Sequence, residues 1–133
     1  MYPITTISTS FLSLIYLILA VRVVSLRRLY QISVGSKGNK GLKMAIRAHG
    51  NFSEYTPLTL ILCLCAEINH LNCLALTLLM SFFVLGRLIH AHVFLHNPRL
   101  IKLRIVAMML TFIPIAGLAL INLSSSVLSY FKY

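Results

Sequence analysis

The feature that most constrains this chain is its succession of apolar runs, each long enough to cross a membrane. The first extends from Ile4 to Val24, the third from about Cys73 to Phe94 and the fourth from about Ile105 to Leu128. Between the first and third lies a segment with a polar first half and an apolar second half, Leu58–Ala66. Four spans of ~20 residues use about 80 residues and leave roughly 50 for loops and ends. We therefore predict one all-α integral membrane domain over residues 1–133, a four-helix bundle with spans at about 4–26, 44–67, 73–95 and 104–129.

The composition excludes most soluble proteins. Of the 133 residues, 59% are hydrophobic and only 11% are charged, whereas a soluble domain carries about 25% charged residues. A cleavable signal peptide has a basic segment before its apolar core, but no charged side chain precedes Arg22 here. We therefore expect a retained first helix and a multi-pass protein surrounded by membrane lipids.

The basic residues are numerous and unevenly distributed. Twelve Lys and Arg stand against two acids, Glu54 and Glu67. The basic residues in or beside the first loop are Arg22, Arg27, Arg28, Lys37, Lys40, Lys43 and Arg47, and those beside the third are Arg99, Lys102 and Arg104. By the positive-inside rule, these two loops are cytoplasmic and both termini lie on the other side. Topology thus explains most of the positive charge, and no nucleic-acid partner is expected.

Four polar residues share one face of the second helix. Arg47, Asn51, Glu54 and Tyr55 are spaced i, i+4, i+7 and i+8, which places them on one side of an α-helix. Charged groups inside a span are costly and usually face a partner or a water-filled cleft. The simpler alternative is a salt bridge that buries Glu54 against an Arg, but it does not explain why four different polar groups are aligned.

The third and fourth helices carry further polar groups near the same boundary. Arg87, His90 and Phe94 are spaced i, i+3 and i+7, again on one face. The simpler alternative for Arg87 is that its side chain extends to the cytoplasmic interface. Gly86 would permit close packing against a neighbouring helix. Arg104 lies at the start of the fourth helix, where a cation is unfavourable for the helix dipole, so an anion is expected nearby.

The charges alone indicate the chemistry of a ligand. The four arginines at this boundary are Arg28, Arg47, Arg87 and Arg104. Arg binds carboxylates in forked pairs, and the carboxylate of Glu54 can bind an ammonium group. The pattern therefore predicts a small polyanion that also carries an amine, with one arginine free to stabilise a thiolate or another developing anion.

The residues that carry this pattern also resemble a known family. The stretches Arg47-Ala-His-Gly-Asn-Phe-Ser-Glu-Tyr-Thr-Pro57 and Gly86-Arg-Leu-Ile-His-Ala91, followed by Arg104, resemble the MAPEG family, the membrane-associated proteins of eicosanoid and glutathione metabolism. The resemblance covers nearly the whole chain, and it is greatest to the short bacterial members. It implies a homotrimer of four-helix subunits in the bacterial inner membrane, with glutathione as co-substrate bound between neighbouring subunits near the cytoplasmic side.

The resemblance also assigns roles residue by residue. The glutathione-binding positions match Arg28, Arg47, Asn51, Glu54, Tyr55, Arg87, His90 and Phe94. Arg104 matches the catalytic arginine that holds the thiolate and lowers the pKa of the thiol, since only the thiolate is a good nucleophile. The implied activity is a glutathione transferase or peroxidase acting on lipophilic electrophiles.

The chain departs from the family pattern at a few positions. Phe94 stands where the eicosanoid synthases carry Tyr, and Gly50 stands where the prostaglandin synthase branch has a further Arg. The segment from Arg87 to Arg104 is one residue longer than in that branch, so Lys102 is an alternative thiolate partner. These departures weaken the case for eicosanoid chemistry more than the case for glutathione binding.

The sequence leaves two other classes of function to consider, a haem or metal site and a non-enzymatic membrane protein. Histidine pairs in a four-helix membrane bundle can ligate haem, but His90 and His92 do not share a face, and no zinc pattern occurs, so no metal is expected. A non-enzymatic four-helix protein, a small-molecule exporter or lipid-binding scaffold, is the alternative to the enzyme, because Glu54 could be the intramembrane acid of an exporter.

Overall fold

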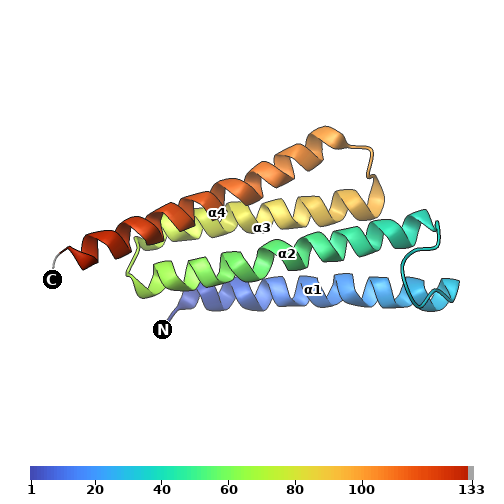
Figure 1. Cartoon of the computed structure of the whole chain (residues 1–133), viewed down its shortest axis with the longest axis horizontal. Helices are drawn as coiled ribbons and strands as arrows, with labels where there is room; N and C mark the ends of the chain where they lie inside the picture. Colours follow the sequence, from blue (N-terminus) through green and yellow to red (C-terminus); the bar gives the residue numbers. More distant parts are fainter. Residues whose placement is uncertain (132–133) are drawn as a thin grey trace.

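The chain folds into four long helices. The computed structural model describes residues 1–131, which form α1 (Pro3–Tyr30), α2 (Lys40–Ile68), α3 (Cys73–His96) and α4 (Ile101–Tyr130). Successive helices run in opposite directions along one long axis (Figure 1). The prediction of an all-α four-helix fold is confirmed.

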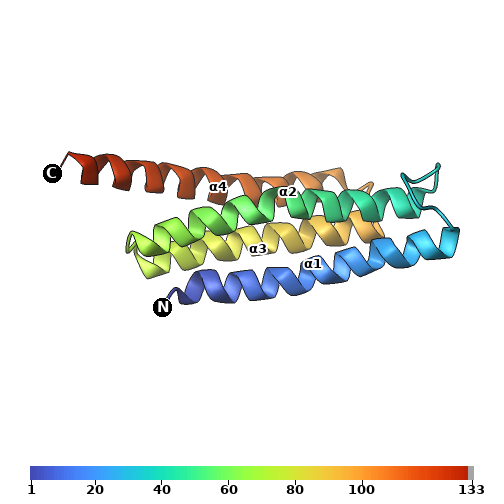
Figure 2. The ribbon, with the colours of Figure 1, turned by 60° about the horizontal axis from the view of Figure 1, so that its bottom comes forward.

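The two middle helices hold the bundle together. Helices α2 and α3 pack against each other and against both remaining helices, whereas α1 and α4 make no contact with one another within the described residues. Both views place α1 and α4 on opposite sides of the central pair (Figures 1 and 2). The loops after α1 and after α3 therefore lie together at one end, which we call the basic end because the lysines and arginines of both loops gather there.

Three of the helices have the length and composition of membrane spans. These are α1, α3 and α4, with mean hydropathies of 2.1, 1.9 and 2.2. Large apolar side chains such as Ile7, Leu14, Leu78, Phe82 and Leu120 are exposed on them, which is the surface expected in contact with lipid. Helix α2 is more polar in its first half, but its 29 residues extend about 44 Å, enough to cross the bilayer beside its neighbours. The protein is therefore an integral membrane protein.

Side chains form hydrogen bonds with the backbone N–H and carbonyl groups that have no partner within a helix because they lie at or beyond its ends. The carboxylate of Glu67, at the end of α2, accepts hydrogen bonds from the backbone N–H of Ile4 (3.0 Å) and Thr5 (2.9 Å) in the first turn of α1. The side chain of Asn39 accepts from Leu42 N at the start of α2 (2.9 Å). At the basic end, Arg27 donates to three carbonyls of the following loop, those of Ile32, Ser33 and Gly35.

Close contact between α3 and α4 depends on one glycine. A Cβ atom at Gly86 would lie 2.9 Å from the carbonyl oxygen of Ala107 and 3.0 Å from the Cβ of Leu110. Real Cβ atoms do not approach other atoms so closely, so Gly86 allows the two helices to touch, as the sequence predicts. This contact brings Arg87, the next residue, against Met108 and Thr111 of α4.

Candidate functional site

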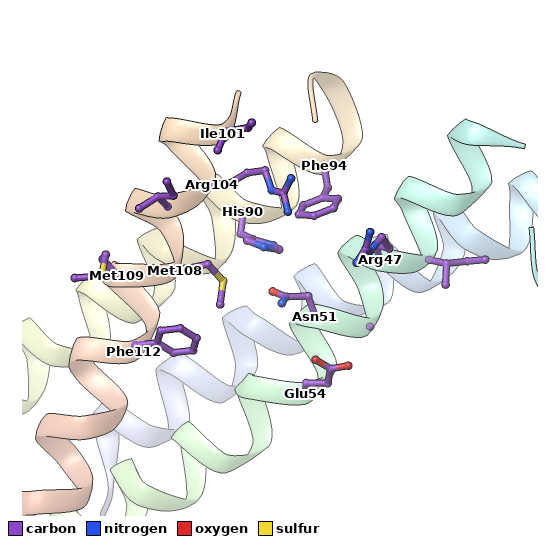
Figure 3. Close-up of a pocket in the computed structure, with 13 residues that line it drawn as sticks. Arg47, Asn51, Glu54, His90, Phe94, Ile101, Arg104, Met108, Met109 and Phe112 are labelled. Carbon is purple, nitrogen blue, oxygen red and sulfur yellow. The ribbon is translucent and has the colours of Figure 1, made fainter. Parts of the chain in front are cut away.

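A cavity of about 730 Å³ opens between α2, α3 and α4 toward the basic end (Figure 3). Its polar lining residues are Arg47, Asn51, Glu54, His90 and Arg104. Its apolar lining residues are Ile46, Phe94, Ile101, Ile105, Met108, Met109 and Phe112, with Gly50 between them. One side is thus polar and charged, while the side formed by α4 is mainly apolar.

Helix α2 contributes the polar face that its sequence spacing predicts. Arg47, Asn51 and Glu54 lie along successive turns and line the cavity (Figure 3). The side chains of Arg47 and Glu54 are exposed and that of Asn51 is half-buried. The alternative that Glu54 is buried in a salt bridge is therefore wrong, and its carboxylate is accessible to a ligand.

Tyr55, the fourth residue predicted on this face, lies behind the cavity rather than in its lining. Its ring meets the ring of Phe112 edge-on, with centroids 5.6 Å apart. The guanidinium carbon of Arg87 lies 5.3 Å from the centroid of the same ring. Tyr55 thus supports the wall between α2 and α4, and the prediction that it binds the ligand stays a prediction.

Arg87 is buried and connects three helices. Its Nη1 donates to the side-chain oxygen of Asn51 on α2 (2.7 Å), and its Nη2 donates to Thr111 Oγ1 on α4. The alternative that Arg87 extends to the interface is wrong, because only 1% of the residue is exposed. It does not line the cavity itself, but it holds Asn51, which does. Its predicted direct contact with the ligand stays untested.

The wall opposite α2 brings an arginine against aromatic rings. The guanidinium carbon of Arg104 lies 4.6 Å from the centroid of the Phe94 ring, and the rings of His90 and Phe94 are 4.7 Å apart. The buried Nε of Arg104 has no hydrogen-bond partner among the described residues. A cation held against an aromatic face and lacking a carboxylate partner is available to an anionic ligand. Lys102, the alternative, does not line this cavity.

Arg28 is the one predicted residue on a helix that contributes nothing to the lining of the cavity. It is exposed in the last turn of α1, and α1 makes no contact with α4 within the described part of the chain. Arg28 is at the basic end, as predicted, but it does not line the cavity. A single chain therefore brings together six of the nine predicted residues: Arg47, Asn51, Glu54, His90, Phe94 and Arg104.

Sequence reasoning missed the residues that support the site from α4. Thr111 Oγ1 accepts a hydrogen bond from Arg87 and donates its own hydroxyl hydrogen bond to the carbonyl oxygen of Ala107 (2.9 Å). Thr111 follows Arg104 by seven residues, so it lies on the same face of α4. That spacing is the signal from which it could have been found.

Comparisons with known proteins relate this chain to a family and to two bacterial proteins. Residues 5–124 match the family model of the MAPEG family. The chain is 35% identical over 101 residues to the inner membrane protein YecN of Escherichia coli K12, a match covering 76% of each chain. The protein of the same name from Escherichia coli O6:H1 matches with the same identity and coverage. The matched segment of the family model contains every residue that lines the cavity.

Proposed function

This chain belongs to the MAPEG family, and on that premise we propose that it binds glutathione and transfers it to lipophilic electrophiles. The observation that carries the proposal is the cavity itself, which combines two arginines and an accessible carboxylate with an apolar wall. Its volume of about 730 Å³ lies within the roughly 300–1,000 Å³ of ligand pockets. We place the protein in the inner membrane, with this cavity on the cytoplasmic side.

The chemistry of glutathione matches the polar side of the cavity. The tripeptide carries two carboxylates, one ammonium group and one thiol. The carboxylate of Glu54 pairs with the ammonium group, and Arg47 binds a carboxylate in a forked pair. Asn51 lies between these two residues on α2 and offers an amide to the peptide backbone.

Arg104 is the catalytic residue of the proposal. Its guanidinium stabilises the thiolate, which attacks the electrophilic carbon to form a C–S bond while the leaving group departs with the bonding electrons. In the peroxidase variant of the reaction, two glutathione molecules are oxidised to the disulfide and the peroxide is reduced to an alcohol and water. The apolar wall of Ile105, Met108, Met109 and Phe112 accommodates the lipophilic partner, which enters from the bilayer.

Binding is tested by thermal unfolding of the detergent-purified protein with millimolar glutathione. Glutathione should raise the unfolding midpoint of the native protein, because it binds the folded state only. Arg47→Ala and Glu54→Gln should remove this rise without changing the midpoint of the free protein, since both side chains are exposed. No rise in the native protein would overturn the binding proposal and favour the non-enzymatic class, an exporter or lipid-binding scaffold.

Catalysis is tested with a chlorodinitrobenzene-type acceptor. Arg104→Ala should lower the turnover number roughly 10²–10³-fold, the usual effect of removing one oxyanion-stabilising donor, while glutathione still binds. Lys102→Ala is the matched control, because it removes a neighbouring positive charge that does not line the cavity. Equal rates in the Arg104→Ala variant and the native protein would show that Arg104 does not activate the thiol.

A further inference from the structure

A second hollow lies at the basic end, on the other side of α3 from α4. Its volume is about 300 Å³, and α1, α2 and the end of α3 line it. The charged residues in its lining are Arg22 and Lys40, both cations, and Tyr30 lies beside them. The hollow shares only the side chain of Phe94 with the site cavity, so the two are separate binding spaces.

The helix geometry places this hollow at the surface of the hydrocarbon layer. Arg22 follows Pro3, the first residue of α1, by a rise of about 29 Å, close to the ~30 Å thickness of the hydrocarbon core. Arg47 precedes Glu67, near the end of α2, by a rise of about 30 Å. Because Glu67 binds the first turn of α1, the two rises start at the same level, so Arg22 and Arg47 lie at about the same depth. An exposed arginine at this depth faces the phosphate groups of lipids.

Apolar surface continues from the hollow toward the membrane interior. Ile18 lies one turn before Arg22 on the same face of α1 and is 67% exposed. Leu88 lies two turns before Leu95, a lining residue, on the same face of α3 and is 37% exposed. The arrangement therefore has a cationic end at headgroup depth and an apolar end in the hydrocarbon.

We propose that this hollow binds an anionic membrane phospholipid by its phosphate headgroup. Arg22 donates a forked pair of hydrogen bonds to the phosphate oxygens, and Lys40 adds a second charge. The backbone N–H groups of Lys40 and Gly41 begin α2, and the positive end of the helix dipole adds to the attraction. The acyl chains then lie along Ile18 and Leu88.

The test is a titration of the detergent-solubilised protein with phosphatidylglycerol, with bound lipid counted by native mass spectrometry. Phosphatidylcholine, which is neutral overall, and soluble glycerol 3-phosphate are the comparison ligands. The assay is run without glutathione, so its outcome does not depend on the proposed enzyme function. We expect one phosphatidylglycerol per chain to bind at least tenfold more tightly than phosphatidylcholine.

Two kinds of variant assign that binding to the hollow. The double variant Arg22→Gln/Lys40→Gln should lower the phosphatidylglycerol affinity roughly tenfold or more, because each cation near the membrane surface contributes substantially to anionic-lipid binding. The matched control Lys37→Gln/Lys43→Gln removes the same charge from residues outside the hollow and should change the affinity less than twofold. Gly41→Leu fills the hollow without changing charge, since a Cβ there meets only Asn39 Oδ1 at 3.4 Å, and it should also weaken binding.

Three outcomes would overturn the proposal. Equal losses in the two double variants would mean that the lipid responds to overall charge. Glycerol 3-phosphate binding as tightly as phosphatidylglycerol would mean that the hollow takes a soluble phosphate. No selective binding in the native protein, together with dissociation of an oligomer in Gly41→Leu, would mean that a second copy of the chain covers the hollow.

Discussion

At the scale of single residues, Arg87 shows how a buried charge can organise a site without belonging to its lining. Its hydrogen-bonding partners, Asn51, Met108 and Thr111, are all neutral. Because breaking a hydrogen bond to a buried ion is costly, the two Nη atoms of the guanidinium hold these groups in fixed positions on α2 and α4. Asn51 therefore lines the cavity while its side-chain oxygen already accepts a hydrogen bond from Arg87.

Replacing Arg87 with Lys should destabilise the protein although the charge is kept. One ammonium group cannot reach both Asn51 on α2 and Thr111 on α4, so a charged hydrogen bond is lost. We expect the free energy of unfolding to fall by about 1–3 kcal/mol, which a lower midpoint of thermal unfolding in detergent would report. Arg47→Lys is the control, because Arg47 is exposed, and it should change stability by less than about 0.5 kcal/mol. Equal midpoints in the two variants would contradict the bridging role of Arg87.

At the scale of helices, the two acids of the chain have separate tasks. Glu54 is exposed in the cavity, whereas Glu67 caps the first turn of α1 from the end of α2. A carboxylate at a helix N-terminus satisfies free N–H groups and interacts favourably with the dipole. Glu67→Gln should therefore cost about 0.5–2 kcal/mol of stability and speed amide hydrogen exchange at Ile4 and Thr5. Glu54→Gln should leave both measurements unchanged in the absence of ligand, and the reverse pattern would refute the assignment.

The contact between α3 and α4 gives a second prediction at this scale. Gly86→Ala should separate the helices, because the added methyl group would lie 2.9 Å from the Ala107 carbonyl. Overpacking of this kind costs about 1–3 kcal/mol, and the lowered thermal midpoint should be accompanied by slower glutathione conjugation, since Arg104 is on the displaced helix. Gly117→Ala is a matched control at the same pair of helices, because its methyl group would meet Leu79 at an ordinary 3.4 Å. A Gly86→Ala protein as stable as this control would disprove the tight contact.

The helices also show which parts of the fold hydropathy can predict. The four predicted spans are found as four helices, but α1 extends to Tyr30 and α2 starts at Lys40, both beyond the predicted bounds. Hydropathy marks the length within the lipid, whereas helix ends depend on local bonds such as the Arg27 contacts and the Asn39 cap. Helical spacing likewise predicted the Arg47–Glu54 face, because that face belongs to one helix. It could not predict the partners of Arg87, since these depend on how three helices pack.

At the scale of the whole molecule, the position of Arg28 bears on the assembly. The helix that carries it lies on the opposite side of the bundle from α4, which carries Arg104 (Figures 1 and 2). The family resemblance implies a homotrimer with glutathione between subunits, and we propose that in such a homotrimer Arg28 reaches the cavity of a neighbouring copy. The site is then complete only in the oligomer, and each half of it can be inactivated separately.

This arrangement predicts complementation between two inactive chains. Arg28→Ala and Arg104→Ala should each lose glutathione conjugation when expressed alone. When the two chains are co-expressed with different tags and isolated as mixed oligomers, some boundaries combine the native Arg28 of one chain with the native Arg104 of the other. Every mixed trimer, whichever chain it holds in two copies, has one intact boundary among its three, so conjugation should return to about a third of the native rate.

The result distinguishes the two possible sources of Arg28. If Arg28 served the cavity of its own chain, every site in a mixed oligomer would lack one arginine and the rate would stay at the level of the single variants. Full activity of Arg28→Ala alone would instead remove Arg28 from the site. Co-expression of Arg47→Ala with Arg104→Ala is the internal control, because both residues line the same cavity of one chain. Such oligomers should remain inactive, since no boundary between those chains regains both side chains.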